Sequence, residues 1–266
     1  MGARKRSIRE RAFTLIELLV VISIIVVLMA LLFPVLRRAR NQARATACQA
    51  KLRQWGLIFK MYTDDNNGRW FQEDGRGGVR WLSETVSMWH GHPSLLFCPM
   101  AVREPPFEDA FSAWGKDGVV QKDGARIAVH GPASYGFNGH IHSLPRPLDP
   151  SWGVPPCWER CDVAGAGNVP VFFDSCYHVA WPQHPYGPPA DPSPLAVLAE
   201  GYAMCIDRHS GGINMLFMDW SIRKVGLKGL WTLKWHPQYD TAGPWTRAGG
   251  VEPEDWPAWM RQFEEY

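Results

Sequence analysis

Side chains that could bind a metal ion or hydrolyse a bond gather in the second half of this 266-residue sequence. They are Asp174, His178, Asp207, His209 and Asp219. Such carboxylates and imidazoles could coordinate a metal or move protons in a hydrolytic site. Their spacing matches no zinc signature, however, and the sequence has neither a Gly-x-Ser-x-Gly nucleophile motif nor a phosphate-binding loop. We therefore expect no enzymatic activity, and we interpret His209 and Asp219 as turn-capping and hydrogen-bonding groups.

A second group of potential metal ligands is the run from Asp64 to Gly68, which combines acidic side chains with Asn and Gly. An EF-hand loop requires an oxygen ligand at its fifth position and Gly at its sixth. Here the fifth position is Gly68 and the sixth is Arg69. The run therefore predicts the end of a helix followed by a turn.

The longest apolar run covers 21 residues, 13–33, without a lysine or arginine. As a helix it would be about 31 Å long, which is enough to cross a bilayer. Glu17 lies near its start, and an unpaired carboxylate at that depth costs roughly 3 kcal/mol. The run therefore predicts a membrane-spanning helix in which Glu17 needs a partner.

The residues around Glu17 carry a family resemblance. A basic leader, the small residue Ala12 and the sequence Phe-Thr-Leu-Ile-Glu-Leu-Leu-Val-Val-Ile that starts at Phe13 resemble the N-terminal signal of type IV prepilins and type II secretion pseudopilins. The resemblance implies that a prepilin peptidase cuts between Ala12 and Phe13 and methylates the new amino terminus. Glu17 would pair with that terminus in a neighbouring subunit. Ala12 departs from the Gly that is usual before the cut.

The apolar run is also compatible in principle with other kinds of N-terminal segment. A secretory signal has an apolar region of only about 7–15 residues. A lipoprotein site at Cys48 is separated from the run by Arg37, Arg38, Arg40 and Arg44. A plain single-pass anchor with an incidental Glu17 is the main alternative.

Two features are expected after the span. Pro34 lacks an amide hydrogen and should kink the helix near the bilayer surface. Beyond it, apolar residues recur at helical spacing, which predicts an amphipathic continuation that packs on a globular head. These residues are Ala45, Cys48, Leu52, Trp55, Phe59 and Tyr62.

The middle of the chain is interrupted constantly by Gly and Pro, with short apolar runs at 94–98, 169–173 and 213–218. Short strands joined by long loops are expected there. The order of several short motifs, among them Phe97-Cys98-Pro99, resembles pseudopilin-like proteins with an H-x9-DG motif. In this sequence His209 and Asp219 fit that motif, but Trp220 replaces its Gly. A hairpin from Ile213 to Val225 is expected, and its turn type stays open because Trp accepts a positive φ poorly.

The six cysteines allow 15 disulfide pairings, and the sequence does not select among them. They are Cys48, Cys98, Cys157, Cys161, Cys176 and Cys205. The exported location that the resemblance implies permits disulfides. Cys48 lies on the apolar helix face, where a buried thiol is its simplest state.

The last part of the chain is rich in tryptophan. After Pro253, the side chains of Trp256, Trp259, Met260 and Phe263 share one face of an expected short amphipathic helix. We expect that helix to dock on the head.

The expected organisation is a leader (1–12), a transmembrane helix (13–36), its amphipathic continuation (37–63), a head (64–230) and a Trp-rich extension (231–266). The fold class is α+β, a pilin-like lollipop in which the long N-terminal helix packs on a small antiparallel sheet with long loops. The resemblance implies a single-pass inner-membrane protein with its N-terminus in the cytoplasm and its head in the periplasm.

The function expected from the resemblance is that of a structural subunit of a type II secretion pseudopilus or a type IV pilus-like filament. Its partners would be the prepilin peptidase, further copies of itself, other pseudopilins and the inner-membrane assembly platform. The formal net charge of +2 does not favour nucleic acid. No cofactor is expected, although some pseudopilins bind calcium, so an unlocated calcium site stays open. The alternative is a membrane-anchored exported domain that binds or cleaves a ligand such as a glycan.

Overall fold

The computed structural model describes residues 15–72, 80–89, 93–101, 117–122, 125–130, 133–143, 156–183, 186–193, 196–197 and 201–264. The chain divides into two compact units after Ala43. Helix α1 (Leu15–Asp65) contributes to both units, which are described here one at a time.

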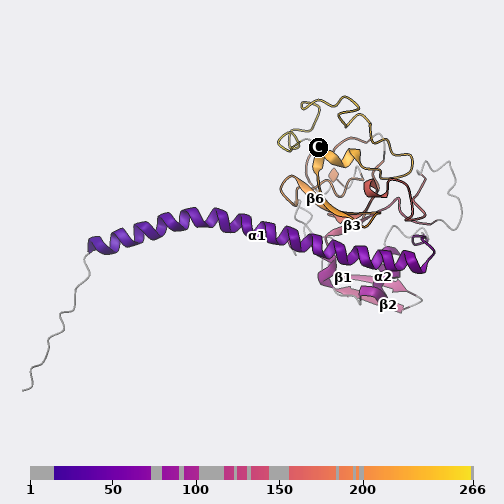
Figure 1. The fold of residues 1–266 in the computed structure, drawn as a ribbon, viewed down its shortest axis with the longest axis horizontal. Coiled ribbons are helices and arrows are strands. Elements are labelled where there is room, and N and C mark those ends of the chain that lie inside the picture. The colour runs from indigo at the N-terminus through magenta and orange to yellow at the C-terminus, as the bar shows by residue number, and fades with distance from the viewer. Residues whose placement is uncertain are drawn as a thin grey trace, which may run out of the picture. The chain divides into compact units, whose positions relative to one another are not determined.

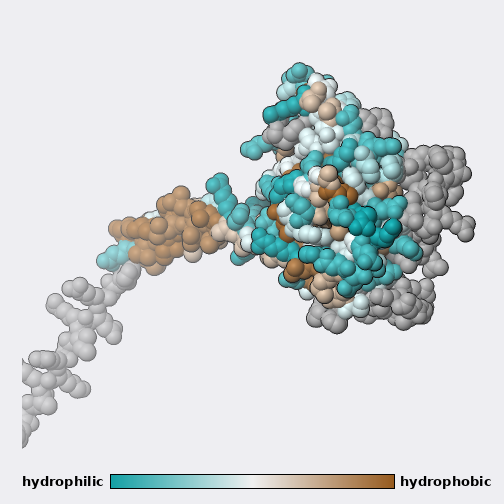
Figure 2. All heavy atoms as spheres, turned by 45° about the vertical axis from the view of Figure 1, so that its right-hand side comes forward, coloured by the Kyte–Doolittle hydropathy of each residue, from teal (hydrophilic) through white to brown (hydrophobic). Residues whose placement is uncertain are grey.

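The described part of the first unit is the apolar portion of α1. Its large side chains are exposed, from 44% for Val21 and Ile25 to 80% for Leu15. Figure 2 shows this portion as an almost uniformly hydrophobic surface. Its most apolar window is long and hydrophobic enough to cross a membrane, and none of that window is buried within the structure. Pro34 lies inside the helix, which continues beyond it.

In the second unit, the amphipathic end of α1 packs on the globular core as the sequence predicts. The side chains of Cys48, Leu52, Trp55 and Phe59 are completely buried. Their spacing of three and four residues places them on one side of the helix. After Asp65 the chain turns at Asn67 and Gly68, both of which have positive φ. The amide of Gly68 donates a hydrogen bond of 2.7 Å to the carbonyl of Thr63, and this closes the helix end.

The core contains a five-stranded sheet with the strand order β5-β3-β4-β6-β7. Two of its strands, β3 and β6, are labelled in Figure 1. Its strands are β3 (Tyr135–Asn138), β4 (Pro170–Asp174), β5 (Val179–Ala180), β6 (Gly212–Phe217) and β7 (Ile222–Gly226). The expectation of a purely antiparallel sheet is wrong in one respect, because β3 and β5 pair in parallel. A short loop reverses the chain between β4 and β5, and β3 already runs opposite to β4, so β5 has the same direction as β3.

The two central strands β4 and β6 are buried on both faces. Phe172 and Leu216 belong to the core that includes α1, whereas Phe173 and Met215 belong to a second core under the C-terminal segment. The sheet therefore separates two hydrophobic cores. Because both faces of its central strands are buried, the sequences of these strands are mostly apolar and do not alternate with polar residues.

Shorter elements complete the second unit. They are α2 (Arg80–Trp89), the 3-10 helices η1 (Pro93–Leu96), η3 (Ala166–Asn168) and η4 (Leu227–Thr232), and a separate two-stranded sheet of β1 (Asp117–Lys122) and β2 (Ala125–His130). In α2, the rings of Trp81 and Trp89 lie 5.4 and 5.8 Å from the ring of Trp55 in α1. The strand expected at 94–98 is absent from that described segment, because Pro93 opens a 3-10 helix that ends at Leu96.

The predicted hairpin forms between β6 and β7, which are joined by residues 218–221. The amide of Trp220 donates to the carbonyl of Phe217, and the amide of Phe217 donates to the carbonyl of Ser221. Trp220 has a φ of 68°, which is the left-handed position of a hairpin with a bulge. Trp220 therefore adopts the conformation for which a glycine would be favoured.

The prediction of a short helix near the C-terminus is wrong, because described residues 253–263 form consecutive turns. Pro257 supplies no amide hydrogen, and it disfavours a helical conformation for Trp256 before it. Trp256 and Met260 are nevertheless buried in the second core, and Trp259 and Phe263 pack against it. The segment docks on the sheet through its apolar side chains without a regular helix.

Candidate functional site

The expected processing residues Ala12 and Phe13 lie outside the described residues. Glu17 lies in the first turn of α1, within its exposed apolar portion. The cut before Phe13, its methylation and the pairing of Glu17 therefore stay predictions.

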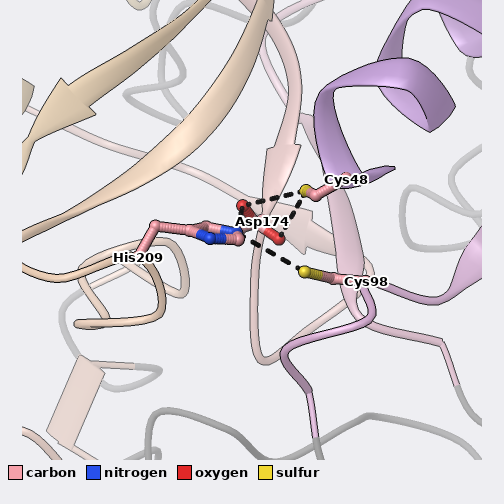
Figure 3. A group of neighbouring side chains, drawn as sticks. All are labelled: Cys48, Cys98, Asp174 and His209. Carbon is pink, nitrogen blue, oxygen red and sulfur yellow. Dashed lines mark hydrogen bonds and ion pairs between the residues drawn. The ribbon is translucent and has the colours of Figure 1, made fainter. Parts of the chain in front are cut away.

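A different group of reactive side chains meets inside the second unit. Cys48, Cys98, Asp174 and His209 are each able to offer one metal-binding atom, and these atoms all lie within 4.8 Å of one another (Figure 3). The exposed fraction is 0% for the two cysteines and Asp174, and 5% for His209. The four side chains come from segments far apart in the sequence and converge on a single point.

Each side chain is positioned by a different element. Cys48 lies on the buried face of α1, and Asp174 is the last residue of β4. Cys98 follows η1, and this segment is tied to α1 because Lys51 Nζ donates to the carbonyl of Phe97 and Trp55 Nε1 to that of Leu95.

His209 lies in the loop before β6. The amide of His209 donates to the carbonyl of Gly212. The carboxylate of Asp207 accepts a hydrogen bond of 2.6 Å from the amide of Gly211, so Asp207 shapes the loop that presents His209.

The contacts within the cluster are close. Nε2 of His209 lies 3.0 Å from Oδ2 of Asp174 and 3.4 Å from Sγ of Cys98. Sγ of Cys48 lies 3.6 Å from both carboxylate oxygens of Asp174. Asp174 therefore stands between the imidazole and the Cys48 thiol.

Three further groups hold the cluster in place. The hydroxyl of Tyr135 donates to Sγ of Cys48 at 3.3 Å, and the amide of Asn214 donates to Oδ2 of Asp174 at 3.0 Å. Nη1 of the buried Arg208 lies 3.6 Å from Oδ1 of Asp174 and donates to the carbonyls of Ser134 and Ser175. A fixed positive charge thus lies behind the carboxylate.

These surroundings shift the pKa values of the cluster. Burial alone would raise the pKa of Asp174, but the hydrogen bond from His209 and the charges of His209 and Arg208 hold it below its usual value. Burial would lower the pKa of His209, but its contacts with Asp174 and Cys98 raise it to about 9. Burial would raise the pKa of Cys98, yet hydrogen bonds from Cys48 and His209 bring it to about 7. Burial and the contact with Cys98 raise the pKa of the Cys48 thiol well above its usual value. The surroundings thus favour an anionic Asp174 beside a cationic His209.

Of the five acidic and imidazole residues that the sequence suggested, the structure brings only Asp174 and His209 together. Asp219 is exposed and accepts hydrogen bonds from the amide and hydroxyl of Ser221, so it belongs to the hairpin turn. His178 lies beside the ring of Tyr177 and is not a member of the cluster. His209 is interpreted from the sequence as a turn-capping and hydrogen-bonding group, and in the structure its side chain contacts Asp174.

Sequence reasoning missed that Cys48 and Cys98 are the partners of these two residues. The placement of Cys48 on the buried helix face was a usable signal, since that face had to lie against the sheet. Nothing in the spacing of Cys98, Asp174 and His209 indicates that they meet.

Comparison with known proteins identifies the N-terminal region. The prokaryotic N-terminal methylation motif matches residues 8–33. The Type IV wide pilus major component PilA4 of Thermus thermophilus is 47% identical over 57 residues, which are 21% of this chain and 44% of that protein. This chain thus spans less than half the length of the curated relative. No solved structure matches the chain.

The match to the methylation motif includes Ala12, Phe13 and Glu17, and it extends through the exposed apolar part of α1 to Phe33. A long N-terminal helix and a small five-stranded sheet make an α+β fold that is consistent with a pilin. The chain therefore carries the N-terminal methylation motif of type IV prepilin-like proteins.

Proposed function

We propose that this chain is a filament subunit of the pilus or pseudopilus type. A prepilin peptidase cuts between Ala12 and Phe13 and methylates the new terminus. The processed subunits leave the inner membrane and pack through α1 into a type IV pilus-like filament or a type II secretion pseudopilus. The head lies in the periplasm before assembly. Other copies, other pseudopilins and an inner-membrane assembly platform are the partners.

The observation that carries this proposal is the exposure of apolar side chains along the first part of α1. Large residues from Leu15 to Leu36 expose 44–80% of their surface. An apolar surface of this extent has to be covered by lipid or by other proteins. A helix that carries a prepilin-type motif can meet both needs, first in the bilayer and then against the same helix of neighbouring subunits.

Glu17 favours assembly of the subunits over simple anchoring in the membrane. A carboxylate in this apolar surface is costly in lipid. The methylated amine of Phe13 in a neighbouring subunit offers a positive charge that neutralises it. Assembly then lowers the free energy of Glu17 as well as that of the apolar helix.

The experiment that tests processing is intact-mass measurement and N-terminal sequencing of the mature protein from its native membranes. We expect a chain that begins with methylated Phe13. Ala12→Gly should be processed in the same way, whereas Ala12→Arg should accumulate uncut because the small residue before the cut is lost. A mature wild-type chain that still begins at Met1, or that begins near Cys48, would contradict the proposal.

Assembly is tested with Glu17→Ala and a matched control in the same stretch of helix. Ser23→Ala is that control, because Ser23 is exposed and its hydroxyl donates only to the carbonyl of Val20 in its own helix. Glu17→Ala should insert and be processed but fail to appear in sheared, sedimentable filaments. Ser23→Ala should assemble normally. If both variants assemble equally well, Glu17 has no role in assembly. If the wild-type protein itself forms no sedimentable filaments, the alternative of an anchored exported domain that binds a ligand is favoured.

A further inference from the structure

We propose that Cys48, Cys98, Asp174 and His209 bind one zinc ion through two thiolates, one imidazole nitrogen and one carboxylate oxygen. Thiolate and imidazole ligands suit Zn²⁺, which takes four of them in a tetrahedral structural site. Calcium instead requires six to eight oxygens, which this cluster does not offer. The site is independent of the processing of the N-terminal motif.

Three of the six separations between the ligand atoms are close to those of such a site, and all six are within 4.8 Å. Zinc–sulfur bonds of about 2.3 Å and zinc–nitrogen or zinc–oxygen bonds of about 2.0–2.2 Å place sulfur about 3.6 Å from nitrogen or oxygen in a tetrahedron, and nitrogen about 3.4 Å from oxygen. The observed separations are 3.6 Å between Cys48 and Asp174, 3.4 Å between Cys98 and His209, and 3.0 Å between His209 and Asp174. The ligands are thus already near their places in a zinc site.

Hydrogen bonds alone account poorly for this convergence. Nε2 of His209 carries at most one hydrogen, yet it faces both Asp174 and Cys98. The thiol of Cys48 likewise has one hydrogen for two carboxylate oxygens at the same distance. An ion placed between the four atoms would satisfy all of these lone pairs at once.

The charges around the cluster also fit a divalent cation. Two thiolates and the carboxylate of Asp174 carry three negative charges, and Zn²⁺ with Arg208 carries three positive charges. Tyr135 donates to the Cys48 sulfur and the amide of Asn214 donates to Asp174, so the anionic ligands are oriented from behind. A neutral, hydrogen-bonded site can be buried at low cost.

Four protein ligands with at most 5% exposure leave no position for a substrate, so the ion would be structural. It would join α1, the segment after η1, the end of β4 and the loop before β6. Zinc would thus fasten the amphipathic end of α1 to the sheet within the second unit.

The competing state is a disulfide between Cys48 and Cys98, which are separate thiols in this structure. A disulfide would use the two sulfurs but would not require Asp174 and His209 to face them. We therefore favour the ion, and the experiment distinguishes the two states.

The test uses the full chain, purified in detergent, loaded with zinc and then passed through a desalting column. Elemental analysis should find close to one zinc per chain. Cys98→Ser and His209→Asn should lower zinc affinity by at least about tenfold. Cys205→Ser should not, because Cys205 is equally buried but lies in the second core.

A second readout is independent of whether the ligand variants fold. Wild-type protein loaded with Co²⁺ should show the visible bands of tetrahedral cobalt bound to thiolates, and excess Zn²⁺ should remove them. The proposal is overturned if wild-type protein retains no zinc, if Cys205→Ser loses as much zinc as Cys98→Ser, or if peptide mapping of the native protein finds Cys48 and Cys98 joined as a disulfide.

Discussion

The carboxylate of Asp174 lies between two buried cationic groups, with Oδ2 at 3.0 Å from Nε2 of His209 and Oδ1 at 3.6 Å from Nη1 of Arg208. This relationship joins the end of β4 to the loop before β6. The end of β4 and the loop before β6 are thus held together by contacts of a single acidic side chain.

We predict that Asp174→Asn destabilises the metal-free protein by about 3–5 kcal/mol, because it removes a buried negative charge that lies 3.6 Å from the buried charge of Arg208. Urea unfolding of the full chain in detergent with a chelator measures the loss. Asp219→Asn is the control, and it should change stability by less than about 0.5 kcal/mol because Asp219 is exposed. Equal losses in the two variants would show that Asp174 has no special role.

Tyr135→Phe should weaken zinc binding by about tenfold, because the hydroxyl that donates to the Cys48 sulfur is lost. Competition with a chromophoric chelator measures the affinity. Tyr202→Phe removes a buried hydroxyl of the second core, which contacts Tyr239 instead, and should leave the affinity unchanged. An unchanged affinity in Tyr135→Phe would remove Tyr135 from the site.

The β6–β7 hairpin offers a matched pair of glycines, because Gly212 pairs with Gly226 across the ladder. A Cβ at Gly212 would lie 2.3 Å from the carbonyl oxygen of Val225, whereas a Cβ at Gly226 would come no closer than 3.8 Å to its nearest neighbour. Gly212→Ala should therefore cost about 1–3 kcal/mol or more, and Gly226→Ala close to nothing. Thermal unfolding of the two variants provides the comparison, and a neutral Gly212→Ala would contradict the hairpin register.

Stability should fall in mild acid because of His140. Burial and the neighbouring His236 lower the pKa of His140 from 6.5 to about 3, and its Nε2 contacts the carbonyl of Pro182 at 2.9 Å. Between these pH values the unfolded chain binds a proton that the folded chain does not, so stability decreases as pH falls, by about 1.4 kcal/mol per pH unit at most.

Urea midpoints of wild type and His140→Gln at pH 7 and pH 5 check this prediction. Glutamine keeps a donor for Pro182 but does not titrate. The wild type should therefore lose more stability than the variant between the two pH values. Parallel losses would place the acid sensitivity elsewhere in the chain.

The parts of the fold that could be predicted from the sequence are those coded by local spacing. The buried face of α1 follows from the intervals between Cys48, Leu52, Trp55 and Phe59, and β6 and β7 follow from two apolar runs around a turn. The prediction of a C-terminal helix was wrong. The effect of Pro257 on the backbone before it and the burial of Trp256 determine the conformation there, more than the helical spacing of the aromatic residues does. The prediction of a strand at 94–98 was wrong for a similar reason, because Pro93 opens the 3-10 helix η1.

The buried cluster could not be predicted, because its geometry is set by the order of strands. Asp174 and His209 become neighbours only when β4 pairs with β6, and Cys48 reaches them only when α1 covers that sheet. Long-range pairing of this kind leaves no periodic signal in the sequence.

The strand β7 is at one end of the strand order and carries positive charge. Arg223 and Lys224 are exposed on it; Arg223 lies 3.5 Å over the ring of Phe217, and Lys224 donates to the carbonyl of Ser210. Positive charges on an edge strand oppose the approach of a second β7. Strand-to-strand pairing between two copies of the head through β7 is thus disfavoured.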